Sequence, residues 1–283
     1  MPLNTRAVIL HSTSIILFGI FAGAAASQEP DYSKAVQESE GVIKVYMDGQ
    51  GPLKQITAYK WANAATPQQV GHLLLYLNDD GSPVASSKVG PTVAQFAGQA
   101  RPSDMRIDHS PVSMTEKRVE FKYDQDTVWT SPPSKIDLTR IDQAPAPDPT
   151  EPRRASQART IAREFSAEVD EAEAKHANAA RQIRLLPTPV HRYGSQDIAK
   201  EGIISGNIFL FVVEGGNPQV ILLIEAVREK GEVFWRYGLS RRSVSGLTVE
   251  YKGTKVWEVP RIVDTNRSQS LFRIRDPRVP SRP

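Results

Sequence analysis

Side chains that commonly carry out metal or acid–base chemistry are few and widely separated in this sequence. Beyond the N-terminal segment the histidines are His72, His109, His176 and His191, and no two of them have the spacing of metal ligands. The sequence has no cysteine, which excludes thiolate zinc sites, iron–sulfur clusters, cysteine nucleophiles and disulfides. We therefore predict no metal site and no cofactor.

Motifs for nucleophilic catalysis and phosphate binding are absent as well. Gly202, Ser205 and Gly206 approach the Gly-x-Ser-x-Gly elbow of hydrolases, but their spacing is wrong. No Gly-rich loop followed by Lys and Ser occurs after an apolar run. The sequence thus predicts no catalytic residue.

Glu225 is the carboxylate with the most unusual surroundings, because it follows the apolar run 220–224. A carboxylate at the end of such a strand could act as a general acid or base. It could also face solvent or pair with Arg228 or Arg236, and we favour this structural interpretation.

Tryptophans are the other candidates, because their rings can stack on sugar rings. Trp129 and Trp257 recur at equivalent places in two related segments, each beside a valine, which is typical of core aromatics. Trp61 and Trp235 carry no such signal. We therefore take Trp61, Trp235 and Glu225 as the candidate binding residues.

The sequence segments that would position these residues occur as two related copies. Residues 71–83 align with 206–218 without a gap, and residues 119–132 align with 247–260. Both copies of the second block read Tyr-x4-Val-Trp-x2-Pro. In the first block glycine, leucine and proline recur: Gly71, Leu75, Gly81 and Pro83 correspond to Gly206, Leu210, Gly216 and Pro218. Two ungapped blocks in the same order indicate an internal duplication.

Each unit is predicted to consist mainly of antiparallel strands. The apolar runs 208–213 and 220–226 flank a Gly-Gly-Asn-Pro turn, which is typical of a hairpin. Residues 91–111 lack periodicity, and we expect a long loop there. Proline-rich residues 143–154 form a linker. Residues 155–180 are predicted to be a helix, with Ile161, Phe165 and Val169 on one stripe and Ser156 as a possible cap.

The fold class that follows is α+β, mostly β, with two tandem antiparallel β units and one helix between them. The predicted boundaries are a signal peptide at 1–26, a first β unit at 27–142, the linker at 143–154, the helix at 155–180, a second β unit at 181–264 and a basic Pro/Arg-rich tail at 265–283.

The N-terminal segment predicts export. A single arginine precedes the apolar run 15–22, and Ala24-Ala25-Ala26 forms a small-residue cleavage site. An uncleaved anchor helix is the alternative, but the apolar run is shorter than the ~20 residues that span a bilayer. No later segment has the length and hydropathy of a span. We expect the mature protein in the periplasm or outside the cell.

Charge is unevenly distributed along the chain, whose formal net charge is +3. Residues 27–150 hold 12 basic and 16 acidic side chains, a net −4, whereas residues 151–283 hold 22 and 16, a net +6. The basic tail is typical of a flexible end, with adhesion to anionic envelope polymers as the alternative. No basic stripe with interleaved aromatics occurs, so nucleic acid is not an expected partner.

Five segments carry a resemblance to a known family: residues 162–167, 184–189, 192–193, 208–212 and 222–226. In them the chain resembles an uncharacterised family of exported hypothetical proteins of planctomycete bacteria. The resemblance implies export and two related β-rich units. The family has no established activity, so no catalytic residue is implied.

These observations favour an exported, non-enzymatic binding or scaffold protein of the cell envelope or extracellular space. Its expected partner is an envelope polysaccharide or another envelope protein. The alternative is a hydrolase of envelope polymers that uses carboxylates in a groove between the units. A third possibility is a self-associating subunit built on one pseudo-symmetric sheet.

Overall fold

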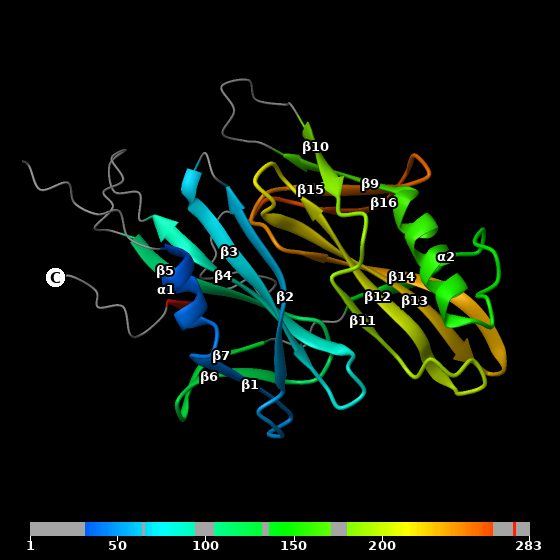
Figure 1. Ribbon diagram of the computed structural model, residues 1–283, viewed down its shortest axis with the longest axis horizontal. Helices are drawn as coiled ribbons and strands as arrows, with labels where there is room; N and C mark the ends of the chain where they lie inside the picture. Colours follow the sequence, from blue (N-terminus) through cyan, green and yellow to red (C-terminus); the bar gives the residue numbers. More distant parts are fainter. Residues whose placement is uncertain are drawn as a thin grey trace, which may run out of the picture. The chain divides into compact units, whose positions relative to one another are not determined.

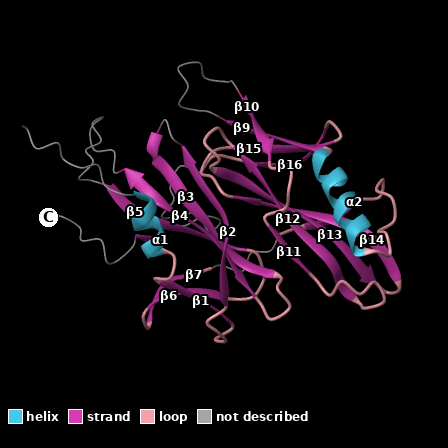
Figure 2. Cartoon of the chain, viewed as in Figure 1, coloured by secondary structure: helices cyan, strands magenta, loops and turns pink. Residues whose placement is uncertain are grey.

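The computed structural model describes residues 32–63, 66–93, 105–131, 136–170, 180–262 and 274–275. Within these residues the chain is mostly strand, with two helices and several antiparallel sheets (Figures 1 and 2). The α+β, mostly β fold class is therefore confirmed. The predicted signal peptide, residues 1–26, lies outside the described residues.

The first half of the structure, residues 32–131, starts with a helix and continues in strands. Its elements are α1 (Tyr32–Ser39), β1 (Ile43–Met47), β2 (Lys54–Asn63), β3 (Thr66–Leu77), β4 (Pro83–Val93), β5 (Met105–Ser113), β6 (Val119–Tyr123) and β7 (Asp126–Thr130).

The second half, residues 150–262, repeats this order, and one short strand follows each half. Its elements are α2 (Glu151–Arg163), β9 (Phe165–Asp170), β10 (Ala180–Leu185), β11 (His191–Tyr193), β12 (Gly202–Val212), β13 (Pro218–Glu229), β14 (Glu232–Arg241), β15 (Leu247–Tyr251) and β16 (Thr254–Val259). The short strands are β8 (Leu138–Arg140) and β17 (Ile274–Arg275).

Three antiparallel sheets organise these strands. One has three strands in the order β1-β6-β7, and one has five in the order β17-β5-β4-β3-β2. The third has nine: β16-β15-β9-β10-β12-β13-β14-β8, with β11 also paired to β12. In the second half the counterparts of the two smaller sheets are therefore joined into one, through β10.

Strand register matches between the halves at the residues that the sequence aligned. In β3–β4, His72 pairs with Val89 and Tyr76 with Ala85, and 135 residues later Asn207 pairs with Ile224 and Phe211 with Val220. Both hairpins have a register shift one residue further on. The hairpins β6–β7 and β15–β16 also match in register and in the place of their shift, 128 residues apart. We call residues related by these offsets equivalent. Internal duplication itself stays a prediction.

The two short strands cross between the halves. β8 follows the first half in sequence but pairs with β14 of the second half. β17 follows the second half but pairs with β5 of the first half. Each half therefore completes the edge of the other half's sheet.

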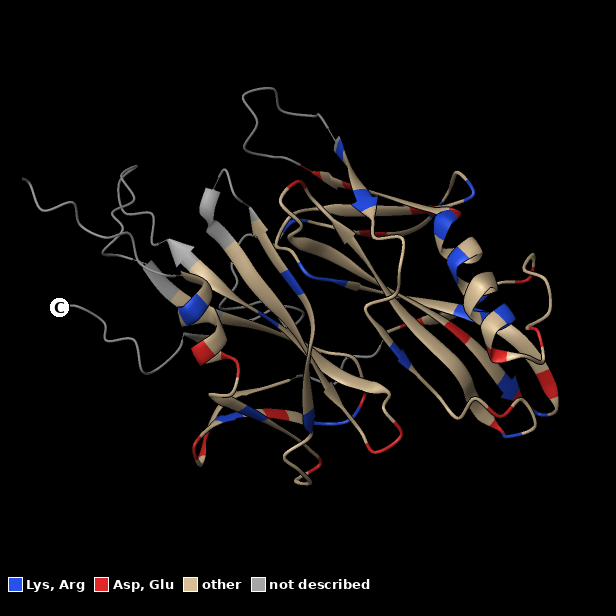
Figure 3. Cartoon of the chain, in the orientation of Figure 1, with Lys and Arg blue, Asp and Glu red and all other residues tan. Residues whose placement is uncertain are grey.

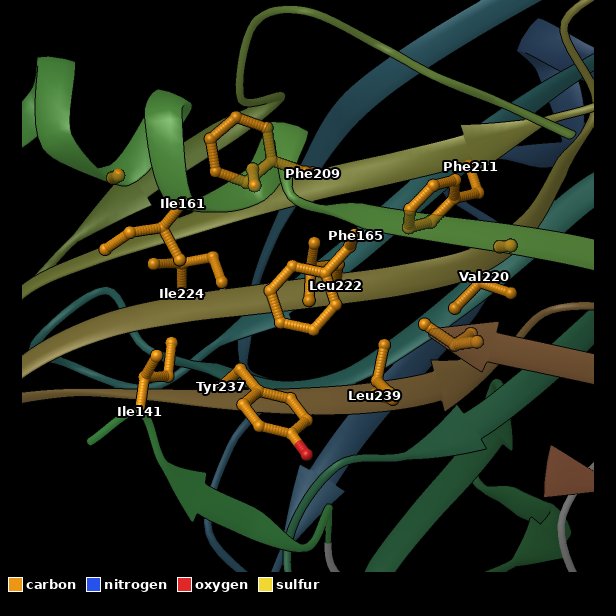
Figure 4. Close-up of a cluster of buried hydrophobic side chains, with 14 of the residues drawn as sticks. Ile141, Ile161, Phe165, Phe209, Phe211, Val220, Leu222, Ile224, Tyr237 and Leu239 are labelled. Atoms are coloured by element: carbon orange, nitrogen blue, oxygen red, sulfur yellow. The ribbon is translucent and has the colours of Figure 1, made fainter. Parts of the chain in front are cut away.

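Each half buries an apolar core beneath its helix. In the second half, Ile161 of α2 and Phe165 of β9 pack on Phe209, Leu222 and Ile224 of β12 and β13, as Figure 4 shows. In the first half α1 covers β3 in the same way, with Val36 fully buried.

The predicted helix at 155–180 is corrected by the structure. The helix begins earlier, at Glu151 after the N-cap residue Thr150, and ends at Arg163. Phe165, Ala167 and Val169 then alternate as buried residues of a strand. A spacing of four residues fits one turn of helix and two periods of strand equally well, which explains the error. Residues 171–179 lie outside the described residues.

Two further expectations are corrected. The loop predicted at 91–111 is strand at 91–93 and 105–111, in β4 and β5. In the tail predicted at 265–283, Ile274 and Arg275 form β17. Helix α1 was not predicted, because its eight residues are largely polar.

Candidate functional site

The two halves meet face to face along an apolar seam. β3 contributes Leu73, Leu75 and Leu77, all buried, and β12 contributes the equivalent residues Ile208, Leu210 and Val212. Alternate residues of the same strands point to the other face, into the core beneath each helix. The seam therefore uses the same face of both sheets.

A pocket of about 230 Å³ opens at one end of this seam. Met114 and Thr115 line it from the first half, and Leu223 and Glu225 line it from the second. Leu138 of β8, the exposed large apolar side chain among the described residues, also lines it. We call this the seam pocket. It brings apolar walls and a small number of polar groups together, as ligand sites do.

Glu225 lies in this pocket and is 4% exposed. It stands opposite Arg236 in the β13–β14 register and opposite Gly206 in the β12–β13 register. Its Oε2 accepts a hydrogen bond from Arg236 Nε at 2.7 Å, and its Oε1 accepts one from the Tyr193 hydroxyl. Arg236 Nη1 donates to Glu229 at 2.7 Å. The structural interpretation of Glu225, pairing with Arg236, is thus observed.

Tyr193 reaches Glu225 because Gly206 leaves room for its ring. A Cβ atom on Gly206 would lie 2.2 Å from Tyr193 Cζ, so no other residue fits there without displacing the ring. The same device occurs at the equivalent Gly71, where Trp61 fills the space. Burial, and next the negative charge of Glu225, raise the pKa of Tyr193 well above its ordinary value. Tyr193 is therefore a fixed hydrogen-bond donor.

These contacts limit the chemistry of the seam pocket. Among the described residues that line it, Glu225 is the one carboxylate, and its oxygens accept bonds from the buried Tyr193 and the partly buried Arg236. In the described part of the chain no three His, Asp or Glu side chains gather as a metal site. The arrangement can hold and orient a polar group by charge-assisted hydrogen bonds.

The equivalent end of the seam is built differently. Lys88 stands where the second half has Leu223, and its Nζ donates across the seam to Asn217 Oδ1 at 2.9 Å. Arg242 stands where the first half has Met114, and its Nη2 donates to the Ser110 carbonyl at 2.6 Å. Long side chains thus cross the seam at that end.

The structure separates the three sequence candidates. Trp61 is 8% exposed and belongs to the seam core, and Trp235 is 1% exposed and belongs to the core beneath α2. Neither ring is presented on the surface for stacking, so neither joins Glu225 in the pocket. Trp129 and Trp257, assigned to the core from the sequence, are half-buried at the margins of the two cores.

Sequence reasoning missed Tyr193 and did not foresee the pocket. The sequence offered Arg236 as a partner of Glu225, but the pairing of Tyr193 with Gly206 leaves no local signal. Two of the histidines contact residues at the end of α1. His72 contacts Glu40, and His109 contacts Ser39. These two contacts tie α1 to the first sheet.

Charged residues of the second half gather on α2 (Figure 3). Arg153 lies 3.6 Å from Asp148, and Arg192 lies 3.8 Å from Glu151. Arg154 is buried instead and donates to the carbonyls of Asp148, Pro149 and Gln196. Local pairing therefore offsets part of the basic charge near this helix.

Comparisons of the chain with protein families, with curated proteins and with solved structures find no match. Neither helix in the described residues has the length and apolar character needed to cross a membrane. The candidate function therefore rests on the seam pocket itself.

Proposed function

We propose that this chain is an exported, non-enzymatic binding protein that holds its ligand in the seam pocket. The observation that supports binding over catalysis is the state of Glu225, whose two oxygens are engaged by Tyr193 and Arg236. A general acid or base needs a carboxylate that can exchange a proton with substrate. A carboxylate fixed by two donors serves better to position a ligand.

The pocket's size indicates what it takes. At about 230 Å³, it falls below the roughly 300–1,000 Å³ of sites that enclose a drug-sized molecule. It suits one small group, such as a single ring of an envelope polysaccharide. Met114 and Leu223 would lie against the apolar face of that ring, while Glu225 and Arg236 bind its hydroxyl groups.

The test is co-sedimentation of the mature chain with insoluble polysaccharide isolated from a bacterial envelope, with soluble sugar measured in the supernatant. Thr115→Trp fills the seam pocket, and Ser243→Trp makes the same change at the equivalent turn. We expect the wild type and Ser243→Trp to sediment, Thr115→Trp to stay in solution, and no sugar to be released.

Each other outcome contradicts part of the proposal. Equal sedimentation of Thr115→Trp would place binding elsewhere. A wild type that does not sediment would remove polysaccharide as the ligand. Sugar release that Glu225→Gln abolishes would favour the alternative, a hydrolase of envelope polymers.

A further inference from the structure

The turn between β3 and β4 brings two unpartnered oxygen atoms to the seam pocket. Asn78 and Ser82 both line the pocket. Asn78 Oδ1 and Ser82 Oγ are buried, and among the described residues neither has a hydrogen-bond partner. A buried oxygen without a partner carries a desolvation cost that a hydrogen-bond donor relieves. Two such atoms at one pocket favour a ligand that donates hydrogen bonds.

The second half contains the equivalent turn, between β12 and β13. There the Val213 amide donates to the Asn217 carbonyl at 3.2 Å, as the Asn78 amide donates to the Ser82 carbonyl at 3.1 Å. Val213 is equivalent to Asn78, and Asn217 is equivalent to Ser82. The two turns therefore place the same backbone at the two ends of the seam, and their side chains can be compared position by position.

A primary ammonium group lies at the turn of the second half. Lys88 Nζ donates to Asn217 Oδ1 at 2.9 Å and to the Pro218 carbonyl at 3.2 Å. The equivalent acceptors at the seam pocket are Ser82 Oγ and the Pro83 carbonyl, and both residues line the pocket. The fold thus shows which chemical group this arrangement of acceptors holds.

The seam pocket has a leucine in place of this lysine. Leu223 is equivalent to Lys88, and it lines the pocket together with Ser82 and Pro83. Its side chain ends in methyl groups, so it donates no hydrogen bond to either acceptor. The seam pocket therefore keeps the acceptors of the equivalent end without its cation.

Glu225 adds a negative charge that the equivalent end does not have, because its equivalent there is Gly90. Its two oxygens accept one bond each, from Tyr193 and from Arg236. A carboxylate oxygen can accept two bonds, so Glu225 can accept a further bond from a ligand. Hydrogen bonds between an ammonium group and a carboxylate are roughly twice as strong as those between neutral groups.

Both cations that line the pocket have carboxylate partners besides Glu225. Arg236 Nη1 donates to Glu229 at 2.7 Å. Lys117 Nζ lies at the exposed surface, 3.9 Å from Asp48. Within the described residues of this site, a ligand cation at Glu225 is therefore not opposed by an unbalanced positive charge.

We infer that the seam pocket selects a sugar ring that carries a primary ammonium group, which is an amino sugar whose amine is not acylated. The ammonium takes the position that Lys88 Nζ has at the equivalent end. It donates to Ser82 Oγ, to the Pro83 carbonyl and to Glu225. This inference rests on the proposed function, because it names the chemical class of the ligand for the same pocket.

The test compares glucosamine with glucose, which carries a hydroxyl where glucosamine carries the ammonium. Dissociation constants are obtained from shifts of backbone amide signals in two-dimensional NMR spectra of the mature chain, at a mildly acidic pH that keeps the amine protonated. We expect glucosamine to bind at least about tenfold more tightly than glucose, because its bonds are charge-assisted. Thr115→Trp, which fills the pocket, should bind neither sugar.

Leu223→Lys installs the lysine of the first half inside the seam pocket. Its own ammonium should occupy the site, so this variant should bind glucosamine no more tightly than glucose. If Leu223→Lys does not fold, the equivalent residues Ser82 and Asn217 provide a matched pair. Ser82→Ala removes one acceptor and should reduce the preference for glucosamine about threefold or more. Asn217→Ala lies at the other end of the seam and should leave the preference unchanged.

The outcomes separate this inference from the proposed function. Equal affinity for the two sugars would overturn the inference, while co-sedimentation with envelope polysaccharide would still support the binding function. No shift with either sugar would also overturn it, and co-sedimentation again decides the proposed function independently. Shifts that persist in Thr115→Trp would place the sugar elsewhere on the protein. A folded Leu223→Lys variant that keeps the full preference would show that the ammonium does not bind where Lys88 Nζ does at the equivalent end.

Discussion

The two halves of this chain use the same strand pairing to build different interiors. Strand β13 of the second half presents Ile221 and Leu223 to the seam. Strand β4 of the first half has Ser86 and Lys88 at the equivalent positions. Where the second half pairs Glu225 with Arg236, the register of the first half pairs Gly90 with Asp108. The two halves pair their strands in the same way but carry different side chains. This difference leaves a pocket at one end of the seam and places bridging side chains at the other.

The largest loss of stability is expected from substitutions at the centre of the seam. Leu75 and Leu210 are equivalent and fully buried, so Leu75→Ala and Leu210→Ala should each lower the free energy of unfolding by about 2–5 kcal/mol. Urea unfolding of the two variants measures this. A cost below about 1 kcal/mol for either one would show that its sheet does not depend on the seam.

The second largest effect is expected at Arg242, a buried cation whose equivalent in the first half is Met114. Arg242→Met installs the residue of the first half, Met114, and removes a buried charge that no carboxylate of the described residues pairs with, so it should raise the free energy of unfolding by about 1–4 kcal/mol at neutral pH. Burial lowers the pKa of Arg242 to about 9, so the cost of its charge is present below that pH and is relieved as the pH rises through it. The advantage of the variant should therefore shrink above pH 9.

Arg154→Met is the control for this prediction. Arg154 is equally buried, but its guanidinium donates to three carbonyls, so the variant should be less stable than the wild type. Destabilisation by Arg242→Met as well would mean that its single carbonyl bond outweighs the buried charge.

Buried tyrosines give a smaller contrast. The Tyr193 hydroxyl donates to Glu225, so Tyr193→Phe should cost about 2 kcal/mol. Among the described residues the Tyr76 hydroxyl has no hydrogen-bond partner, and its equivalent is Phe211, so Tyr76→Phe should change stability by less than about 0.5 kcal/mol. Thermal and urea unfolding at neutral pH compare the two.

The same two variants should act alike in alkali. Burial raises the pKa of Tyr76 and of Tyr193, so above pH 10 the unfolded chain ionises these hydroxyls while the fold keeps them protonated, and the free energy of unfolding falls as the pH rises. Each phenylalanine should reduce the decline in the free energy of unfolding by up to about 1.4 kcal/mol per pH unit. An unchanged decline between pH 10 and 11 would contradict this.

The smallest expected effect concerns a turn. Asp124 and Lys252 are equivalent and have φ of 51° and 52°, a left-handed conformation that aspartate tolerates better than lysine. Asp124→Lys should therefore cost about 0.5 kcal/mol. Lys252→Asp is the reciprocal control, and a gain from Asp124→Lys in urea unfolding would reverse the interpretation.

The local sequence pattern was sufficient to predict much of the fold but little of the candidate site. The apolar runs around Leu210 and Leu223, with a glycine–proline turn between them, were sufficient to predict the central hairpin. Phe165 and Val169 misled, because their spacing suits helix and strand alike. β17 and the crossing of β8 could not be predicted, because such pairing depends on residues distant in sequence.

The candidate site shows the same limit. Glu225 stood out as a charge at the end of an apolar strand, and Arg236 was named as a possible partner. Tyr193 reaches it only through the pairing of β11 with β12, and Met114 only through the packing of the first half on the second, so neither could be placed beside it from the sequence. The sequence around Trp61 and Trp235 does not distinguish them from surface tryptophans. Only their burial in the structure shows that they are core residues.

The crossing of the short strands affects the order in which the chain can be completed. Residues 274–275 provide the edge partner of β5, so the first half lacks one pairing until these residues have been synthesised. Contacts of such long sequence separation form late and slowly. The first half therefore cannot reach its final structure before residues 274–275 are present, although its other strands precede them by more than 140 residues.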